Sequence, residues 1–237
     1  MKRFQFAGLA LAGSLLLSSG PSLAGITLDG TRVVLAAPSK EASLLIRNTA
    51  SADIMVQTWM DAGDDNADVP FAITPALSRM GPEKQQTLRI LYYGQGLPTD
   101  RESVLWLSVQ EIPQKAKDEN TLQIAVRQRI KFFYRPAGLP GEVAQAPAQL
   151  RWRVVTQDGK AQLEVSNPTA FHVSLAEVKL RSGSKDYTVD TQMVPPSGTR
   201  RLAVHGLPAG AGAGAKVHFE TINDYGAITA HDSDAGA

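Results

Sequence analysis

"RQRIKFFYRP" (residues 127–136) has the composition of a β-strand that runs into a proline stop. Successive side chains of a strand point to opposite faces of the sheet. In the predicted strand 121–134, one face is apolar apart from Gln128 and carries Leu122, Ile124, Val126, Ile130, Phe132 and Tyr134. The other face carries the cations Arg127, Arg129 and Lys131. A strand that is apolar enough to be buried therefore bears an unusual number of positive charges.

Runs of the same kind recur along the chain between clusters of Gly, Pro, Asn and Asp, and no segment shows a long apolar period of 3.6 residues. In the first half they cover residues 31–36, 42–48, 54–60, 86–93, 103–112 and 121–134. In the second half they cover residues 150–156, 161–167, 172–180, 186–194, 199–205, 215–223 and 227–231. We therefore expect an all-β fold of two immunoglobulin-like β-sandwich domains in tandem.

The first 24 residues have the pattern of a cleavable signal peptide. Lys2 and Arg3 precede an apolar run that is too short and too rich in small residues for a membrane span. Ser22 and Ala24 then form a small-x-small cleavage signal. We expect cleavage between Ala24 and Gly25 and export of the remaining chain.

A second composition change separates the two series of strands. Residues 137–149 (AGLPGEVAQAPAQ) are rich in Gly, Pro and Ala and show no apolar period, which is typical of a linker. The sequence thus predicts a signal peptide at 1–24, an N-terminal immunoglobulin-like domain at 25–140 and a C-terminal one at 141–237.

The charge balance and the lack of cysteine exclude several classes of function. The 24 basic and 23 acidic residues leave no overall field that would attract nucleic acid or a membrane surface. We therefore expect no nucleic-acid partner and no membrane insertion. Because cysteine is absent, disulfides, thiol catalysis and cysteine-ligated metals are excluded as well.

No catalytic or cofactor-binding pattern survives inspection. The glycine-alanine stretch at 209–215 lacks the strand, helix and lysine of a phosphate loop, and no G-x-S-x-G motif occurs. The acidic stretch at 61–68 lacks the final glutamate of a calcium loop. The histidines stand singly, without the spacing of a metal site: His172, His205, His218 and His231. We expect a protein that is not an enzyme and needs no metal or other cofactor.

Two interpretations of the strand 121–134 fit its alternation equally well. It can be an ordinary half-buried strand with its apolar face inward and its cations in water. Alternatively, Leu122, Ile124 and Val126 lie along an open edge that is completed by a strand of a partner protein. In that case each apolar side chain buried in the partner would contribute roughly 1.5–3 kcal/mol.

A family resemblance favours the second interpretation. The stretches that carry it follow one another along nearly the whole chain: LDGTRVV (28–34), TPALSR (74–79), LPTDRES (97–103), QEIPQK (110–115), LQIAV (122–126), IKFFYRP (130–136), NPTAFHVSL (167–175) and INDYG (222–226). Together they resemble the periplasmic chaperones of the chaperone–usher pilus pathway (the PapD-like family). The resemblance implies a boomerang of two domains with a cleft between them, located in the periplasm.

The resemblance also implies a function and a set of site residues. The protein would bind, fold and cap pilus (fimbrial) subunits by lending them the strand 121–134, and deliver them to an outer-membrane usher. Leu122, Ile124 and Val126 would fill the hydrophobic groove of the subunit. Arg32 and Lys131 would hold the subunit's C-terminal carboxylate in the cleft.

The resemblance further implies an interdomain salt-bridge cluster of Glu102, Arg135 and Asp224, which would fix the angle between the domains. The short spacing from Gln114 to Thr121 resembles the class of the family that serves rod-like or adhesin-tipped pili. Where the family commonly has two prolines in succession, this chain has Pro75 followed by Ala76, so a role carried by the second proline is in doubt.

Several questions stay open at the level of sequence. Lys131 and the apolar side chains differ in parity along the strand, so a bulge, a twist or the long lysine stem must reconcile them. Arg127 and Arg129 are expected to be solvated. An open edge also allows self-association of the free form. The alternative functions are a secreted two-domain structural or adhesive module and an exported hydrolase, the latter disfavoured by the missing catalytic set.

Overall fold

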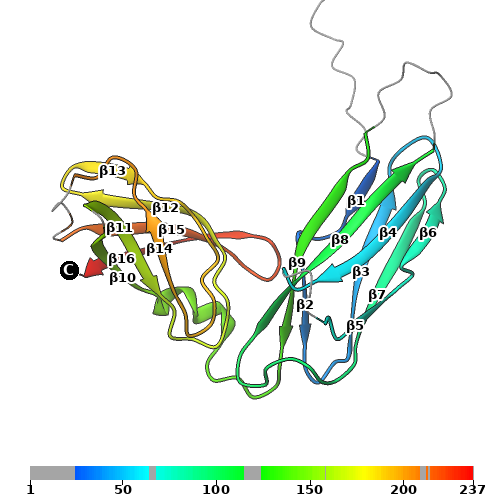
Figure 1. Cartoon of the computed structure of the whole chain (residues 1–237), viewed down its shortest axis with the longest axis horizontal. Helices are drawn as coiled ribbons and strands as arrows, with labels where there is room; N and C mark the ends of the chain where they lie inside the picture. Colours follow the sequence, from blue (N-terminus) through cyan, green and yellow to red (C-terminus); the bar gives the residue numbers. More distant parts are fainter. Residues whose placement is uncertain are drawn as a thin grey trace, which may run out of the picture.

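The computed structural model describes residues 25–63, 68–114, 124–157, 159–208, 212 and 214–236. These residues form two β-sandwiches that meet at an angle, with the first in blue to green and the second in yellow to red (Figure 1). The expected all-β fold of two immunoglobulin-like domains with a cleft between them is confirmed. The predicted signal peptide lies outside the described residues. In the described part of the chain, no helix has the length and apolar character needed to cross a membrane.

The N-terminal sandwich packs a four-stranded sheet on a five-stranded one. The first sheet has the order β1 (Ile26–Leu28), β3 (Glu41–Asn48), β7 (Gln85–Tyr92) and β5 (Phe71–Thr74). The second has the order β2 (Arg32–Ala36), β9 (Arg127–Arg135), β8 (Ser103–Pro113), β4 (Ile54–Asp61) and β6 (Leu77–Met80). The inward faces bury a continuous apolar core whose most enclosed members include Ile46, Leu88, Ile90, Leu107 and Phe132.

One edge of β9 is only partly covered by a neighbouring strand. The chain crosses between the sheets after β1, which pairs with β3, so that β2 can pair in parallel with β9. This pairing begins at Arg32 opposite Lys131 and continues to Arg135. On its other side β9 pairs with β8 from Arg127 to Tyr134. Within the described residues, positions 127–130 of β9 therefore have a strand on one side only, and we call this stretch the open edge.

The C-terminal sandwich is built around β16, which joins both of its sheets. Its strand order is β13 (Lys185–Thr188), β12 (Leu175–Ser182), β15 (Lys216–Ile222), β16 (Ile228–Gly236), β10 (Arg151–Gln157), β11 (Lys160–Ser166) and β14 (Thr199–Ala203). Strand β16 pairs with β15 along most of its length, and its last residues pair with β10. Trp152 and Phe219 contact each other in the core, with ring centroids 5.0 Å apart. The hairpin between β15 and β16 reaches back to the N-terminal sandwich (Figure 1).

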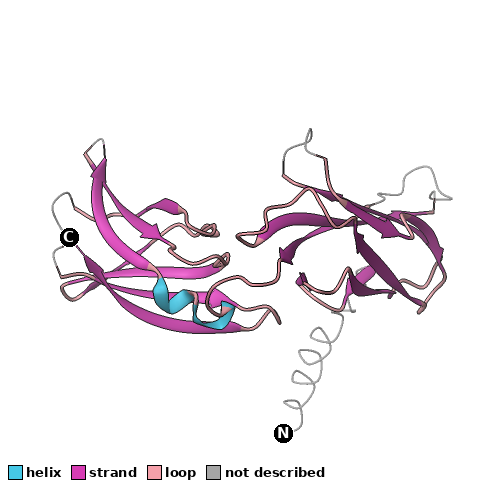
Figure 2. Ribbon diagram, turned by 90° about the horizontal axis from the view of Figure 1, so that it is seen from below, coloured by secondary structure: helices cyan, strands magenta, loops and turns pink. Residues whose placement is uncertain are grey.

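The structure differs from the sequence-based expectation at the predicted linker and at the start of one predicted strand. The segment 137–149 was predicted to be a linker, but it contains the 3-10 turns η1 (Val143–Gln145) and η2 (Pro147–Gln149), drawn in cyan in Figure 2. Ala146 and Val143 pack on the C-terminal core because their small apolar side chains gain from burial. Second, within the described part of the predicted strand 121–134, β9 begins at Arg127 and residues 124–126 are not part of a strand, while residues 121–123 lie outside the described residues.

Candidate functional site

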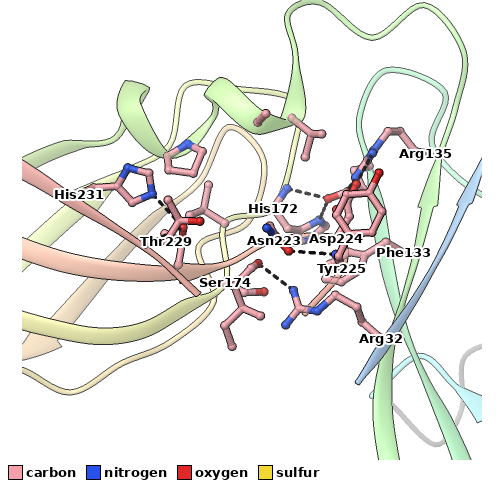
Figure 3. Close-up of a pocket in the computed structure, with 17 residues that line it drawn as sticks. Arg32, Phe133, Arg135, His172, Ser174, Asn223, Asp224, Tyr225, Thr229 and His231 are labelled. Carbon is pink, nitrogen blue, oxygen red and sulfur yellow. Dashed lines mark hydrogen bonds and ion pairs between the residues drawn. The ribbon is translucent and has the colours of Figure 1, made fainter. Parts of the chain in front are cut away.

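A hollow lies between the two domains of the described structure. It has a volume of about 450 Å³ and is lined by β2, β9 and Glu102 of the first domain. From the second domain it is lined by η1, η2, the β15–β16 hairpin and residues 172–174, which lie just before β12. Figure 3 shows Arg32 and Phe133 on the N-terminal side, facing Ser174, Asn223 and His231 of the C-terminal domain. Both domains therefore contribute to this cleft, and its shape depends on the angle between them.

Arg32 and Lys131 lie next to each other at the edge of the cleft. They are direct partners in the β2–β9 pairing, so their side chains leave the sheet on the same face. Nη1 of Arg32 donates to the Ile222 carbonyl at 2.9 Å, and Nζ of Lys131 donates to Oγ of Ser174 at 3.2 Å. Neither cation is paired with a carboxylate in the described part of the chain. The structure thus brings these two predicted anchor residues together and holds each by a neutral acceptor of the opposite domain.

The two cations are partly removed from water. Burial lowers the pKa of the Lys131 ammonium, and the charge of Arg32 lowers it further. Burial also lowers the pKa of Arg32, against the opposing effect of Asp224. In addition, Nε of Arg32 is buried without a hydrogen-bond partner. A carboxylate that entered here would relieve both the repulsion between the cations and the unmet donor, because it accepts from both side chains.

A second set of charges across the same domain boundary is fully paired. Arg135 binds Glu102 with Nη2 and Oε1 2.8 Å apart, and Asp224 with Nη1 and Oδ2 2.9 Å apart. Its guanidinium also lies over the ring of Phe171, 5.4 Å from the centroid. The structure therefore brings together the three residues of the expected interdomain cluster, two from the first domain and one from the β15–β16 hairpin.

Sequence reasoning missed further members of the site. The Oε2 atom of Glu102 accepts from the His172 backbone at 2.8 Å and lies 3.0 Å from Nδ1 of the same histidine. The Glu102 backbone donates to the Ala170 carbonyl at 2.9 Å, which adds a direct main-chain link between the domains. His172 and Ser174 both fall inside the motif NPTAFHVSL, but their partners are residues far away in sequence. Only the docking of the domains reveals them.

Two of the expected groove-filling side chains, Ile124 and Val126, lie just beyond the open edge. Ile124 is 66% exposed and Val126 is 38% exposed, whereas Leu122 lies outside the described residues. The backbone of Val126 still accepts a hydrogen bond from Glu111 at 3.0 Å, so the segment continues the line of β9. Apolar side chains of this size in water at the end of an uncovered strand are typical of a surface that binds another protein.

Between Arg127 and Tyr134, β9 contains no bulge that would change the face on which Lys131 lies. The pairing of β8 with β9 runs unshifted from Ser103–Tyr134 to Gln110–Arg127. Phe132 and Tyr134 accordingly enter the N-terminal core, and Lys131 points from the opposite face toward the cleft. Within β9, Lys131 therefore faces the cleft on one side of the sheet, and Phe132 and Tyr134 face the core on the other.

Arg127 and Arg129 are exposed, as expected from the sequence, and each guanidinium also lies over a tryptophan ring. The guanidinium of Arg127 lies 4.6 Å from the ring centroid of Trp59, and that of Arg129 lies 4.4 Å from that of Trp106. Arg129 also forms an ion pair with Asp61. Their hydrophilic groups are thus held on the outer face of the five-stranded sheet, where the tryptophan faces attract the positive charge.

Comparison with known proteins identifies the family. Residues 25–140 match the N-terminal domain of the PapD pili and flagellar-assembly chaperones, and residues 145–233 match the C-terminal domain of the PapD pili-assembly chaperones. The chain is 40% identical over 219 residues to the "probable fimbrial chaperone YadV" of Escherichia coli K12, covering 88% of this chain and 89% of that protein.

Solved structures agree with this match. A crystal structure of the YadV chaperone superimposes with a TM-score of 0.79 at 38% identity, covering 89% of this chain and 100% of that one. The SafB chaperone of Salmonella enterica, solved in complex with the SafA pilin, gives a TM-score of 0.74 at 28% identity over 91% of this chain and 97% of that one. The chain therefore belongs to the PapD-like family of pilus-assembly chaperones, which are non-enzymatic periplasmic proteins of the chaperone–usher pathway.

Proposed function

We propose that this chaperone binds and caps a pilus subunit by lending it the open edge of β9 together with residues 122–126. The observation that carries the proposal is the combination of exposed Ile124 and Val126 at one end of this edge with two desolvated cations at the other. An uncovered strand edge is a template for a further strand. A strand edge with apolar side chains at one end and cations at the other fits the C-terminal strand of another chain.

The direction of the bound strand follows from the positions of these two ends. If the subunit's carboxylate lies at Arg32 and Lys131, its preceding residues run along the open edge toward Ile124. The subunit strand then has the same direction as β9, like β2, which pairs in parallel with β9 on this side. The guest strand would thus continue the line of β2 and stop where β2 begins.

Leu122, Ile124 and Val126 would occupy the hydrophobic groove of the subunit and complete its core. Main-chain hydrogen bonds along β9 supply affinity without regard to sequence, and the alternating side chains supply specificity. A shift by one residue would turn every apolar side chain to the wrong face. The carboxylate anchor therefore sets the register, and the capped subunit would be handed to the outer-membrane usher without consumption of ATP.

The cluster of Glu102, Arg135 and Asp224 would hold the cleft at the angle that the anchor requires. Desolvation offsets much of the attraction within such a buried cluster, so its main effect is on geometry. The exposed apolar segment at 124–126 argues against a secreted structural or adhesive module, which would not need an unfilled apolar edge. The same edge would let two free chaperone molecules associate in the absence of a subunit.

The experiment is co-expression of the chaperone with a pilus subunit encoded beside it, followed by purification of the complex. We expect a one-to-one complex that is lost with Arg32→Ala or Lys131→Ala. Lys160→Ala, which removes an exposed cation of the C-terminal domain, is the matched control and should leave the complex intact. A subunit whose last residue is removed should also fail to bind. An undiminished complex with both anchor variants would overturn the proposed carboxylate site.

A further inference from the structure

Glu111 is a buried carboxylate for which the proposed subunit binding provides no role. It lies near the end of β8, on the face that also carries Leu107 and Val109 into the core. The residue is only 6% exposed, and its Oε2 atom has no hydrogen-bond partner. Burial raises the pKa of the Glu111 carboxyl, and a hydrogen bond with the Val126 backbone partly opposes this rise. A core position for an acid with an unmet oxygen calls for a positively charged or donating partner.

The chain places Gly25 directly against this carboxylate. A Cβ atom built on Gly25 would lie 2.1 Å from Oε2 of Glu111, so any larger residue here would require the carboxylate to move away. The position of Gly25 is fixed, because its carbonyl accepts from the Thr49 backbone at 3.0 Å. The next residue, Ile26, is buried, and its carbonyl accepts from Nε2 of Gln128 at 2.8 Å.

Gly25 is also the residue at which the predicted leader cleavage creates a new chain end. Hydrolysis of the Ala24–Gly25 bond by a signal peptidase and one water molecule leaves a carboxylate on Ala24, which departs with the leader. It leaves a free amine on Gly25, which takes up a proton at neutral pH because α-amino groups have pKa values of about 7.7–8.0. This ammonium group is bonded to the Gly25 Cα, the atom from which the built Cβ would overlap the Glu111 carboxylate.

We propose that Glu111 is the counter-ion of the α-ammonium group that leader removal creates at Gly25. This ion pair lies next to the segment that carries Ile124 and Val126, because the Glu111 backbone donates to the Val126 carbonyl at 3.0 Å. The pair would therefore connect the N-terminus to this segment. The unprocessed chain has an uncharged amide at this position and cannot form the pair. Removal of the leader thus completes the fold beside the subunit-binding edge. The inference rests on cleavage at Gly25 and not on subunit binding.

The first measurement is the intact mass of the chaperone purified from the periplasm. A chain that starts at Gly25 is expected, and a chain that starts at any other residue overturns the proposal. The second compares the reactivity of the α-amine in the wild type and in Glu111→Gln, using limiting acetyl N-hydroxysuccinimide ester at neutral pH with the lysine amines as internal reference. We expect acetylation of the α-amine to be several-fold faster in Glu111→Gln. Equal rates overturn the pair.

A third measurement guards against misfolding of Glu111→Gln. A chain that retains one extra alanine before Gly25 moves the charge away while Glu111 stays intact. Each change alone should lower the midpoint of urea denaturation, and the two together should lower it no further than either alone. Glu142→Gln, which removes an exposed carboxylate, is the control and should change neither the midpoint nor the reactivity. Additive losses would overturn the proposal, while subunit binding, which none of these measurements uses, is tested separately.

Discussion

Two groups of charges cross the same domain boundary from the same strand, and they differ in whether their charges are neutralised. Arg135 at the end of β9 is paired with Glu102 and Asp224. Lys131, further back on β9, has only a serine hydroxyl, and its neighbour Arg32 has only a backbone carbonyl. Both groups are partly buried, and removing their charges from water costs free energy. Ion pairs offset this cost around Arg135, whereas no ion pair within the described residues offsets it around Lys131 and Arg32. Complete pairing is what a structural joint requires, and incomplete pairing is what a ligand site requires.

Removal of Arg135 is the most severe way to break the paired group. Arg135→Ala leaves Glu102, which is 3% exposed, without its arginine partner, and breaking a buried ion pair in this way costs about 3–5 kcal/mol. We expect a loss of this order in the free energy of unfolding measured by urea denaturation, together with a changed radius of gyration in X-ray scattering.

Arg181→Ala provides the control for this loss. It breaks the exposed pair with Asp186, and such pairs contribute at most about 1 kcal/mol. If Arg135→Ala proved as mild as Arg181→Ala, the distinction between a structural joint and surface charges would be wrong.

Removal of Arg32 should show the opposite behaviour. A hydrogen bond to a charged group is worth about 1.5–3 kcal/mol, so Arg32→Ala should weaken subunit binding by roughly ten- to more than hundred-fold. The free chaperone should lose little stability, because Arg32 gives up only one bond to the Ile222 carbonyl. Calorimetric titration with a peptide that ends like the subunit measures the affinity. An amidated version of the peptide should bind the wild type and the variant equally weakly.

Truncation of Ile124 tests the apolar end of the same site. Each buried methylene is worth about 0.8 kcal/mol, so Ile124→Ala should cost about 2 kcal/mol of binding, or roughly thirty-fold in the dissociation constant. The side chain is 66% exposed in the free protein, so the free energy of unfolding should not change. A drop in stability without a drop in affinity would mean that Ile124 belongs to the chaperone's own core.

The smallest expected effect is a pH dependence that originates at Lys131. Burial lowers the pKa of this lysine below its ordinary 10.5, so in the alkaline range the unfolded chain holds the proton when the folded chain has lost it. The wild type should therefore gain stability relative to Lys131→Met as the pH rises through the folded pKa toward 10.5. Below that window the uncharged variant should be the more stable of the two. Parallel stability curves for both proteins would show that the lysine is not desolvated.

The strands were largely predictable from sequence, but the partners across the cleft were not. Long β-branched and aromatic runs such as that of β9 are recognised by alternation alone. Strands β1, β5 and β6 are only three or four residues long and were missed, because such short runs show no period. His172, Ser174 and the Ile222 carbonyl depend on how the domains dock, and the tryptophans beneath Arg127 and Arg129 depend on the register of three strands.

The position at which β2 begins would limit the length of the subunit strand that can pair with β9. Strand β2 pairs with β9 only from Lys131 onward, so a visiting chain that followed the same line would meet Arg32 as a physical barrier. The chaperone would then select subunits by where their C-terminal strand ends. A subunit whose chain ends at Arg32 would bind, whereas one with extra C-terminal residues would not bind, however well its groove accommodates the apolar side chains of the chaperone. Quality control of this kind needs no recognition of sequence at all.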